Sequence, residues 1–332
     1  QAIECYHGAL SVIEREVVPL DYAMTQNNLG LAYASLRTGD SSRNLQRAIE
    51  CYRKALTVYT PEASPLDYAM TQDNLGIAFY SLPTGDHLSN LHRAINCHRE
   101  ALRFRSPDTA PLDYARTLNN LGVSLHALTD RNRAANLREA IECYKEALRH
   151  RTLQSTPLDY ATTQSNLGLA YTDLPTGDRT ENLQRAIVCF AKALTVSTIE
   201  DTPLDYAMTQ NNLGRAYTDM PGGDRATSLR RAVECYEKAL AVYTVEATPF
   251  EYASTQINLG LAYTGLQPTD WPAYVHRAIK CYQEALRVFT LQEAPYRYAM
   301  VQTNLGSAYN DLASEDQAIN LVQAIHCYHQ AL

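Results

Sequence analysis

Eight cysteines are the residues in this sequence that could most readily form disulfides or bind a metal. They recur once every 46 residues, at Cys5, Cys51, Cys97, Cys143, Cys189, Cys235, Cys281 and Cys327. Equivalent positions on successive packed helices lie roughly 10 Å apart, whereas a disulfide needs Cα atoms within about 7 Å and a zinc site needs converging sulfurs. We therefore expect free thiols that pack as small apolar side chains, no metal site, and a cytoplasmic setting.

The histidines show no metal-binding pattern either. Five of the nine concentrate in one region, at His87, His92, His98, His126 and His150, without pairing at i, i+4 to a second ligand. His98 follows Cys97 directly, but adjacent residues on a helix point about 100° apart, so the two do not form a catalytic dyad.

A recurring aspartate is the next candidate for chemistry. It stands at Asp40, Asp86, Asp178 and Asp224, with Asn132 in the third copy. One carboxylate per repeat at the start of a helix is typical of N-capping rather than of acid catalysis. Asn44 and its equivalents could cap instead if the helix begins later. We find no non-repeated acid, base or nucleophile cluster and no G-x-x-x-x-G-K-[ST] loop, so we predict neither an enzyme nor a cofactor.

A row of asparagines is the strongest candidate for ligand binding. It comprises Asn28, Asn74, Asn120, Asn166, Asn212, Asn258 and Asn304. A side-chain amide carries both a donor and an acceptor, so an evenly spaced row can bind an extended peptide backbone. Alternatively, each asparagine bonds a neighbouring repeat and sets the stacking. Both interpretations fit the sequence.

The cysteine, aspartate and asparagine positions all belong to a 46-residue repeat that recurs along the chain. Its centre, Tyr22–Tyr33, returns six more times without an insertion or deletion, which indicates a single repeat domain over residues 1–332. We assign residues 1–18 to a half repeat, followed by repeats 19–64, 65–110, 111–156, 157–202, 203–248, 249–294 and 295–332. Both termini fall in the same phase of the repeat, so we expect a fragment of a longer array.

Each repeat is expected to form two helices. A proline at Pro19 and its equivalents suits a first helical turn, and the first helix should run to about Leu36. Hydroxyl and carboxylate residues at four of these starts resemble capping boxes: Ser64–Asp67, Thr156–Asp159, Thr202–Asp205 and Thr248–Glu251. Gly30 and its equivalents cost helix propensity, so we expect another backbone to approach there. The second helix carries the apolar stripe Leu45, Ala48, Ile49, Tyr52, Leu56 and Tyr59, giving an all-α fold of fifteen helices.

Helical geometry predicts which residues line a groove. On the first helix, Met24, Asn27, Asn28 and Leu31 point away from the stripe that packs on the second helix. The expected groove residues in other repeats are Met70, Asp73, Ile77, Arg116, Asn119, Val123, Met208, Asn211 and Arg215. Arg116 and Arg215 are the groups there that would seek an anion.

Two repeats depart from the pattern. The third carries Arg116, Leu118, Leu125 and His126 in place of the residues of its sisters. The sixth replaces its inter-helix turn with residues 267–274, which include the single tryptophan, Trp271. Such a tryptophan could anchor a partner or pack over its own turn.

Charge and hydropathy exclude two classes of partner. Asp and Glu outnumber Lys and Arg by 36 to 29, for a net charge of −7, and no basic run is present, which argues against nucleic acid. We see no span of about 18 apolar residues and no signal-peptide pattern, which argues against a membrane.

The two helical stripes together resemble the tetratricopeptide repeat, W-x2-L-G-x2-Y followed by A-x3-F and P. Here Gln26-x2-Leu29-Gly30-x2-Tyr33, Ala48-x3-Tyr52 and Pro65 match everything except the tryptophan, although the period is 46 rather than 34 residues. The resemblance implies an α-solenoid of antiparallel helix pairs in a right-handed superhelix, with the first helices lining a concave groove that binds a protein or extended peptide.

The sequence segments PLDYAMTQNNLG and NLQRAIECY resemble, more specifically, those of bacterial repeat arrays found beside caspase-like CHAT protease domains. Related repeats flank STAND-type signalling NTPases. That resemblance implies a sensing or scaffolding part of a larger bacterial signalling protein. A different possibility is a structural array that associates end to end through open helix faces.

Overall fold

The computed structural model describes residues 1–266, 271–312 and 316–332. Within these residues the chain forms fifteen α-helices and no strand, in the expected order of one leading helix and seven pairs. The helices are α1 (Ala2–Leu10), α2 (Pro19–Ala34), α3 (Ser41–Ala55), α4 (Pro65–Ser81), α5 (His87–Leu102), α6 (Pro111–Ala127), α7 (Arg133–Ala147), α8 (Pro157–Asp173), α9 (Arg179–Ala193), α10 (Pro203–Thr218), α11 (Arg225–Leu240), α12 (Pro249–Gly265), α13 (Trp271–Leu286), α14 (Pro295–Asp311) and α15 (Gln317–Ala331). The all-α prediction is confirmed.

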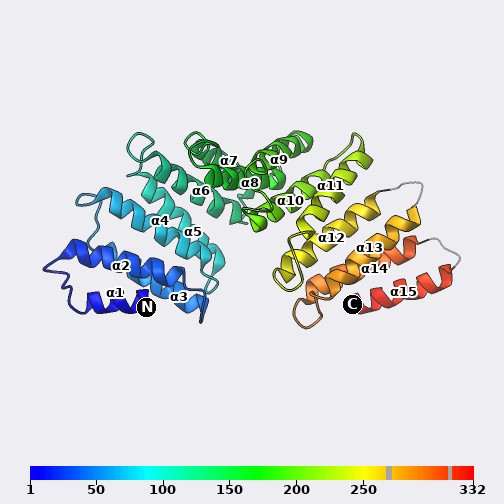
Figure 1. Cartoon of the computed structure of the whole chain (residues 1–332), viewed down its shortest axis with the longest axis horizontal. Coiled ribbons are helices and arrows are strands. Elements are labelled where there is room, and N and C mark those ends of the chain that lie inside the picture. The colour runs from blue at the N-terminus through cyan, green and yellow to red at the C-terminus, as the bar shows by residue number, and fades with distance from the viewer. Residues whose placement is uncertain (267–270, 313–315) are drawn as a thin grey trace. The chain divides into compact units, whose positions relative to one another are not determined.

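The helices form two compact units, Gln1–Leu174 and Pro175–Leu332. The N-terminal unit contains α1 to α8 and the C-terminal unit contains α9 to α15 (Figure 1). We call the even-numbered helices, each of which begins with proline, the A helices, and the odd-numbered helices the B helices. Each helix packs against the next one along the chain within its unit, as the repeat pattern predicts. None of the described helices is long and apolar enough to cross a membrane.

Each A helix begins at its proline, as predicted, but the expected capping boxes are wrong. At Ser64, Thr156, Thr202 and Thr248 no side-chain hydroxyl caps the helix, and ψ lies between 60° and 69°. A hydroxyl reaches the amides of the first turn when the N-cap residue is extended, and these residues are not. Their backbone N–H groups instead close the preceding turn, as Ser64 N–H does on the Thr60 carbonyl at 3.0 Å.

The B helices do use the recurring aspartate as an N-cap. Asp40 accepts from the N–H groups of Ser42 and Arg43, and its equivalents Asp86, Asp178 and Asp224 each accept one backbone N–H. The third repeat is an exception, because the Asn132 side chain makes no capping bond. Asn44 does not compete for the cap, since its amide donates to the Thr38 carbonyl in the turn at 3.0 Å.

The two helices of a pair approach each other closely where a glycine of the A helix packs against an aromatic ring of the B helix. A Cβ added at Gly30 would lie 2.6 Å from Cε1 of Tyr52, and Gly122 has the same relation to Tyr144. The close approach predicted at these glycines is present, but a side-chain ring makes it rather than another backbone. Those tyrosines are almost completely buried, so the ring cannot move aside.

The A helices form the more closely packed row. Successive A helices contact one another, α2 with α4, α4 with α6 and α6 with α8 in the N-terminal unit, and α10 with α12 in the C-terminal unit. Successive B helices make no comparable contact among the described residues. A stack whose one row is closer curves toward that row, so the A helices line the inner side of each unit.

The cysteines and the single tryptophan belong to the packing. All eight cysteines are free, and only Cys5 is exposed. Burial raises the pKa of the Cys143 thiol to about 12. Trp271 begins helix α13, so the prediction that it lies in the turn 267–274 is wrong; it is half-buried and packs against the core cluster that includes Tyr282. Residues 267–270, over which it could pack, lie outside the described residues.

Candidate functional site

The asparagine row joins one A helix to the next. Asn74 Nδ2 donates to Asn27 Oδ1 at 3.2 Å, and the bond recurs from Asn166 to Asn119 at 3.1 Å and from Asn258 to Asn211 at 3.2 Å. The geometry is that of the stacking interpretation, in which each repeat binds its predecessor. All seven asparagines of the row are half-buried, so part of each amide still faces solvent.

The predicted groove surface needs one correction. Met24 is 50 % exposed, Ile77 is 41 % exposed, and Leu31 and Met208 are exposed as well. Asn27, Asp73 and Asn119, however, are buried, so the exposure expected of them is wrong. A helical wheel places them opposite the B helix, but the A helix of the following repeat packs over that position. Their side chains accept the bonds of the asparagine row.

The remaining groove residues fall in two places. Arg116 is 43 % exposed on α6, and Arg215 is half-buried on α10. Met208 and Asn211 both line a small pocket of about 180 Å³ in the C-terminal unit, together with Phe250 from α12.

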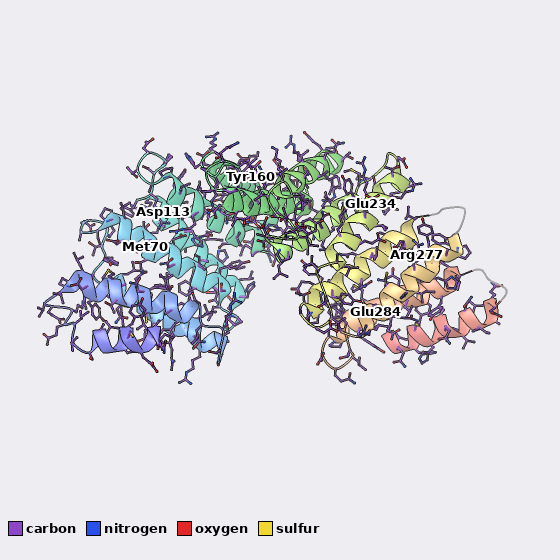
Figure 2. The ribbon with its side chains drawn as sticks, viewed as in Figure 1. Met70, Asp113, Tyr160, Glu234, Arg277 and Glu284 are labelled. Carbon is purple, nitrogen blue, oxygen red and sulfur yellow. The ribbon has the colours of Figure 1, made fainter. Side chains whose placement is uncertain are left out.

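A buried carboxylate in the second repeat distinguishes it from its sisters. Asp73 on α4 is 0 % exposed and stands where other repeats carry Asn27, Asn119 and Asn211. His98 Nδ1 lies 2.8 Å from Asp73 Oδ1, and Arg105 Nη1 donates to Asp73 Oδ2 at 3.1 Å. Figure 2 labels Met70 on α4, the helix that carries Asp73, and Asp113 at the start of α6.

The third repeat completes the cluster. The Arg116 guanidinium lies 3.5 Å from Asp73 Oδ2 and 2.9 Å from Asp113 Oδ1, and Asn120 Nδ2 donates to Asp73 Oδ1 at 3.3 Å. Burial by itself would raise the pKa of Asp73, but the His98 hydrogen bond and the charges of His98, Arg105 and Arg116 outweigh it and lower that pKa below its usual range. Asp73 is therefore a carboxylate at neutral pH.

The positive charge of a second buried arginine, Arg151, is less well balanced by nearby carboxylates. It stands one repeat after Arg105 and is also buried. Its guanidinium donates to Thr163 Oγ1 at 3.0 Å and lies 3.5 Å from Asp159, a carboxylate that is half exposed. Burial lowers the pKa of Arg151. The second and third repeats therefore carry a charge at a position where the first, fifth and sixth carry an aromatic ring, at Tyr59, Tyr243 and Phe289, and the fourth carries Ser197.

A pocket of about 230 Å³ opens beside this cluster, between α4, α5 and α6. Ile77 and Tyr80 contribute from α4, His98 from α5, and Val123 and Ser124 from α6. The Ser124 hydroxyl is buried and has no hydrogen-bond partner among the described residues. An unpaired buried hydroxyl costs about 1–3 kcal/mol, whereas the other six repeats carry alanine at this position.

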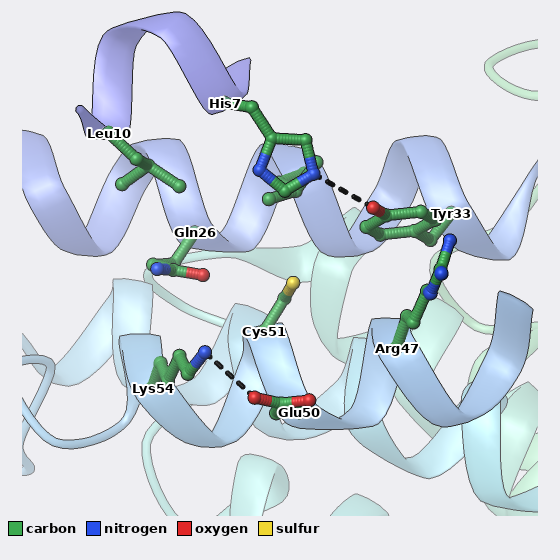
Figure 3. Close-up of a pocket in the computed structure, with 9 residues that line it drawn as sticks. His7, Leu10, Gln26, Tyr33, Arg47, Glu50, Cys51 and Lys54 are labelled. Atoms are coloured by element: carbon green, nitrogen blue, oxygen red, sulfur yellow. Dashed lines mark hydrogen bonds and ion pairs between the residues drawn. The ribbon is translucent and has the colours of Figure 1, made fainter. Parts of the chain in front are cut away.

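A larger pocket, of about 500 Å³, lies between α1, α2 and α3 (Figure 3). Four of its polar side chains are paired, His7 with the Tyr33 hydroxyl at 2.9 Å and Lys54 with Glu50 at 2.8 Å, whereas the buried Oε1 atom of Gln26 has no hydrogen-bond partner among the described residues. The ion pair is exposed, and such pairs contribute little to stability or recognition. The smaller pocket differs in that a buried ionic cluster of Asp73, His98 and Arg105 lies beside it.

The Asp73 cluster was missed by the sequence reasoning, although a signal was present. Aligning the repeats shows histidine at His98 where the sisters have tyrosine or phenylalanine, arginine at Arg105, and serine at Ser124. These three changes fall in different helices, and only the structure shows that they meet. No group of three histidine, cysteine or acidic side chains suited to a metal ion is found in the described part of the chain.

Comparison with known families supports an array of tetratricopeptide type. Residues 23–57 and 115–150 match the tetratricopeptide repeat, and residues 207–241 and 299–332 match the Sel1 repeat. These stretches fall in four of the seven helix pairs. No curated protein matches the chain.

Solved structures show the same fold. One is a chain of the APC/C hetero-tetramer Cut9–Hcn1, with a TM-score of 0.57, 18 % identity, and coverage of 89 % of this chain and 44 % of that chain. Another is the C-terminal part of a repeat-containing protein from Cytophaga hutchinsonii, with a TM-score of 0.50, 13 % identity, and coverage of 96 % and 93 %. The chain thus spans less than half the length of the first. At these identities the likeness establishes a solenoid of stacked helix pairs.

Proposed function

We propose that this chain is a scaffold that binds a protein or an extended peptide along its A helices. The observation that carries the proposal is a row of exposed apolar side chains on A helices, which includes Met24, Leu31 and Ile77 in the N-terminal unit. Exposed apolar groups in register mark interaction surfaces, and methionine adapts to varied partners. Arrays of tetratricopeptide and Sel1 repeats generally serve as interaction scaffolds.

The asparagine row supports an extended partner beside these apolar groups. The Nδ2 atoms of Asn74, Asn166 and Asn258 are engaged between repeats, which leaves their Oδ1 atoms to accept peptide N–H groups. Adjacent helices lie about 10 Å apart, and an extended chain advances about 3.3 Å per residue. A bound peptide would therefore meet one asparagine at every third residue.

The proposal can be tested by introducing a charged residue among the exposed apolar side chains of the A helices. Ile77→Arg should abolish binding of members of a random 12-residue peptide library without changing the helical circular dichroism spectrum. Leu88→Arg is the matched control, because Leu88 is similarly exposed but lies on a B helix. Equal binding by wild type and Ile77→Arg, or an equal loss in both variants, would refute the groove.

The resemblance to arrays beside CHAT protease domains extends this proposal to a role in bacterial signalling, in which the scaffold senses a partner for an effector domain. A pull-down with the full-length parent protein tests that role. If the effector's activity is the same with and without the captured partner, the sensing role is wrong.

A second candidate function is end-to-end association. Helix α15 exposes Ile319, Val322 and Ile325 on one face, and open apolar faces of terminal repeats promote self-association. Sedimentation velocity over a range of concentrations should then show growing species that Val322→Lys abolishes. A single monomeric species at every concentration would rule this candidate out.

A further inference from the structure

Two arginines in the third repeat show how this fold holds a guanidinium beside the start of an A helix. Arg151 donates to Thr163 Oγ1 at 3.0 Å and lies 3.5 Å from Asp159. Arg116 lies 2.9 Å from Asp113. Both aspartates stand in the first turn of an A helix. Each guanidinium is therefore placed next to a carboxylate that recurs along the array.

Two repeats further along, the carboxylates are retained and the arginines are not. The equivalent acids are Asp205 and Glu251, the equivalent threonine is Thr255, and the arginine positions carry Met208 and Tyr243. Within residues 1–266, 271–312 and 316–332, neither acid forms an ion pair, and both are exposed. An acidic residue in the first turn stabilises a helix by itself, so the two carboxylates alone do not indicate a ligand.

A pocket and a buried tyrosine provide the independent evidence. The pocket, of about 180 Å³, is lined by Met208 and Asn211 from α10, Phe250, Glu251, Ser254 and Thr255 from α12, and Tyr243 between these helices. Tyr243 is 5 % exposed, and no residue that the structure describes bonds to its hydroxyl. Burial, followed by the charges of Glu251 and Asp205, raises the pKa of Tyr243 to about 12. The pocket thus contains a neutral hydroxyl without a partner, within electrostatic reach of two carboxylates.

The size and the charge of the pocket restrict its occupant. Pockets that hold drug-sized ligands begin at about 300 Å³, so this smaller one suits a single side chain. One cation is already nearby, since Arg297 packs over the Phe250 ring at 5.0 Å and donates to Ser254 Oγ at 3.1 Å. The two carboxylates still outnumber it. The pocket therefore favours a second cation and disfavours an acidic side chain.

An arginine matches the groups that remain. Its guanidinium has five N–H donors and no acceptor, and the Glu251 carboxylate, Thr255 Oγ1 and the Tyr243 hydroxyl can all accept. Its aliphatic stem suits the apolar Met208 beside them. We infer that this pocket receives an arginine side chain of the partner, as the third repeat receives its own Arg151. The inference rests on the proposed function, because the pocket lies between two A helices.

The first two repeats carry the same arrangement in the N-terminal unit. Asp21, Asp67 and Thr71 stand at the positions of the two acids and the threonine, and Met24 and Tyr59 stand at the arginine positions. No described residue is ion-paired with either aspartate. Tyr59 is 4 % exposed, and burial and the charges of Asp67 and Asp21 raise its pKa. Each unit therefore offers one site for an arginine.

The first experiment compares three capped peptides, built from four units of Arg-Gly-Ser, Lys-Gly-Ser or Glu-Gly-Ser. In fluorescence-polarisation titrations of the full chain, the arginine peptide should bind at least about fivefold more tightly than the lysine peptide, because a planar guanidinium donates to several acceptors at once. The glutamate peptide should not bind. A general attraction to the net charge of −7 would draw arginine and lysine equally, so equal affinities would overturn the inference.

The chain has five methionines, and carbon-13 labels on their methyl groups let nuclear magnetic resonance distinguish the two sites. The arginine peptide should shift the signals of Met208 and Met24. Glu251→Gln should weaken the Met208 response about threefold, the size expected for an exposed ion pair, and leave the Met24 response unchanged. Glu234→Gln is the matched control, because Glu234 is exposed on the B helix α11 (Figure 2), and it should change neither response. An unchanged Met208 response in Glu251→Gln would overturn the inference.

A second variant supplies the arginine from within the chain. Tyr243→Arg reproduces Arg151 of the third repeat, so its guanidinium should pair with Glu251 and abolish the Met208 response. The Met24 response should persist and shows that the rest of the array is folded. Because Glu251 is exposed, Glu251→Gln remains informative if Tyr243→Arg disturbs the packing of its unit. Full binding of the arginine peptide at Met208 in Tyr243→Arg would contradict the shared position.

Peptides from the 12-residue library separate this inference from the proposed function. A bound peptide should lose affinity when its arginine is changed to glutamine. If peptides bind the A helices and fail to bind Ile77→Arg, but none requires an arginine, the inference fails and the scaffold function stands. If the arginine peptide shifts Met208 and no library peptide binds, the arginine site stands and the scaffold function fails.

Discussion

Changing Asp73 to asparagine tests whether the buried cluster is held together by charge. The substitution preserves the shape of the side chain and supplies the residue found at Asn27 and Asn119 in sister repeats. It removes the negative charge 3.1 Å from Arg105, whose side chain is 3 % exposed. Breaking a buried ion pair by removing one partner costs about 3–5 kcal/mol. Because asparagine retains one acceptor oxygen, we expect a loss of about 3 kcal/mol at pH 7.

The stability difference between wild type and Asp73→Asn should also depend on pH, in a direction that the pKa of Asp73 determines. The pKa of Asp73 is lowered in the folded chain from its ordinary value of 3.8, so its charge stabilises the fold at pH values above the unfolded pKa. That contribution is lost as pH falls through the folded pKa. The difference in free energy of unfolding between wild type and Asp73→Asn should therefore be largest at pH 7 and should decrease toward zero below about pH 4.

Urea denaturation followed by circular dichroism measures the gap, and hydrogen exchange localises it to α4, α5 and α6, since arrays can open locally. The double variant Asp73→Asn with Arg105→Tyr is the control, because it gives the second repeat the residues that the first repeat carries at these positions, Asn27 and Tyr59. It should recover at least about 2 kcal/mol of the loss, as expected for directly coupled neighbours. If Asp73→Asn is as stable as wild type at pH 7, or if the double variant recovers nothing, the charge argument is wrong.

Three further predictions concern the repeat itself. Changing Asn74 and Asn166 together to alanine should lower the free energy of unfolding by about 0.5–1.5 kcal/mol per lost bond and broaden the calorimetric melt; a peptide-binding loss at unchanged stability would instead favour the ligand interpretation. Gly122→Ala should destabilise the fold by about 1–3 kcal/mol through overpacking, whereas Gly8→Ala, which has no atom within 4 Å of the added Cβ, should not destabilise it in the same melt. With a pKa raised to about 12 by burial, Cys143 should react with a thiol reagent at pH 8 only after denaturant is added, and rapid labelling of the native chain would contradict that.

The fold could be predicted because residues that favour helix starts recur at fixed positions in every repeat or nearly every repeat. The recurring proline has no N–H to lose at the first helical position, so the A helices were expected to begin near these prolines, and each begins at its proline. The ends were less certain, and the first A helix stops at Ala34 rather than near Leu36. The aspartate caps were also predictable, since a carboxylate before a helix has few other local partners.

The buried cluster could not be predicted by the same reasoning. A helical wheel describes one helix against one neighbour, and it placed Asp73 on an open face. The A helix of the next repeat covers that face, which is a contact between residues 47 positions apart, such as Asp73 and Asn120. The partnership of Asp73 with His98 and Arg105 likewise spans 25 and 32 residues. Sequence shows that these residues depart from the repeat, but their proximity depends on three-dimensional packing.

The cluster also constrains how such an array can gain or lose repeats by recombination. Asp73, His98 and Arg105 all lie within residues 65–110, so an in-register exchange near Pro65 or Pro111 moves them together. An exchange between Asp73 and His98 would instead yield one chain with a buried carboxylate lacking its cations and another with a buried arginine lacking its anion. Exchanges outside the stretch from Asp73 to Arg105 keep the three residues in one chain, so this stretch is favoured as a single unit of exchange.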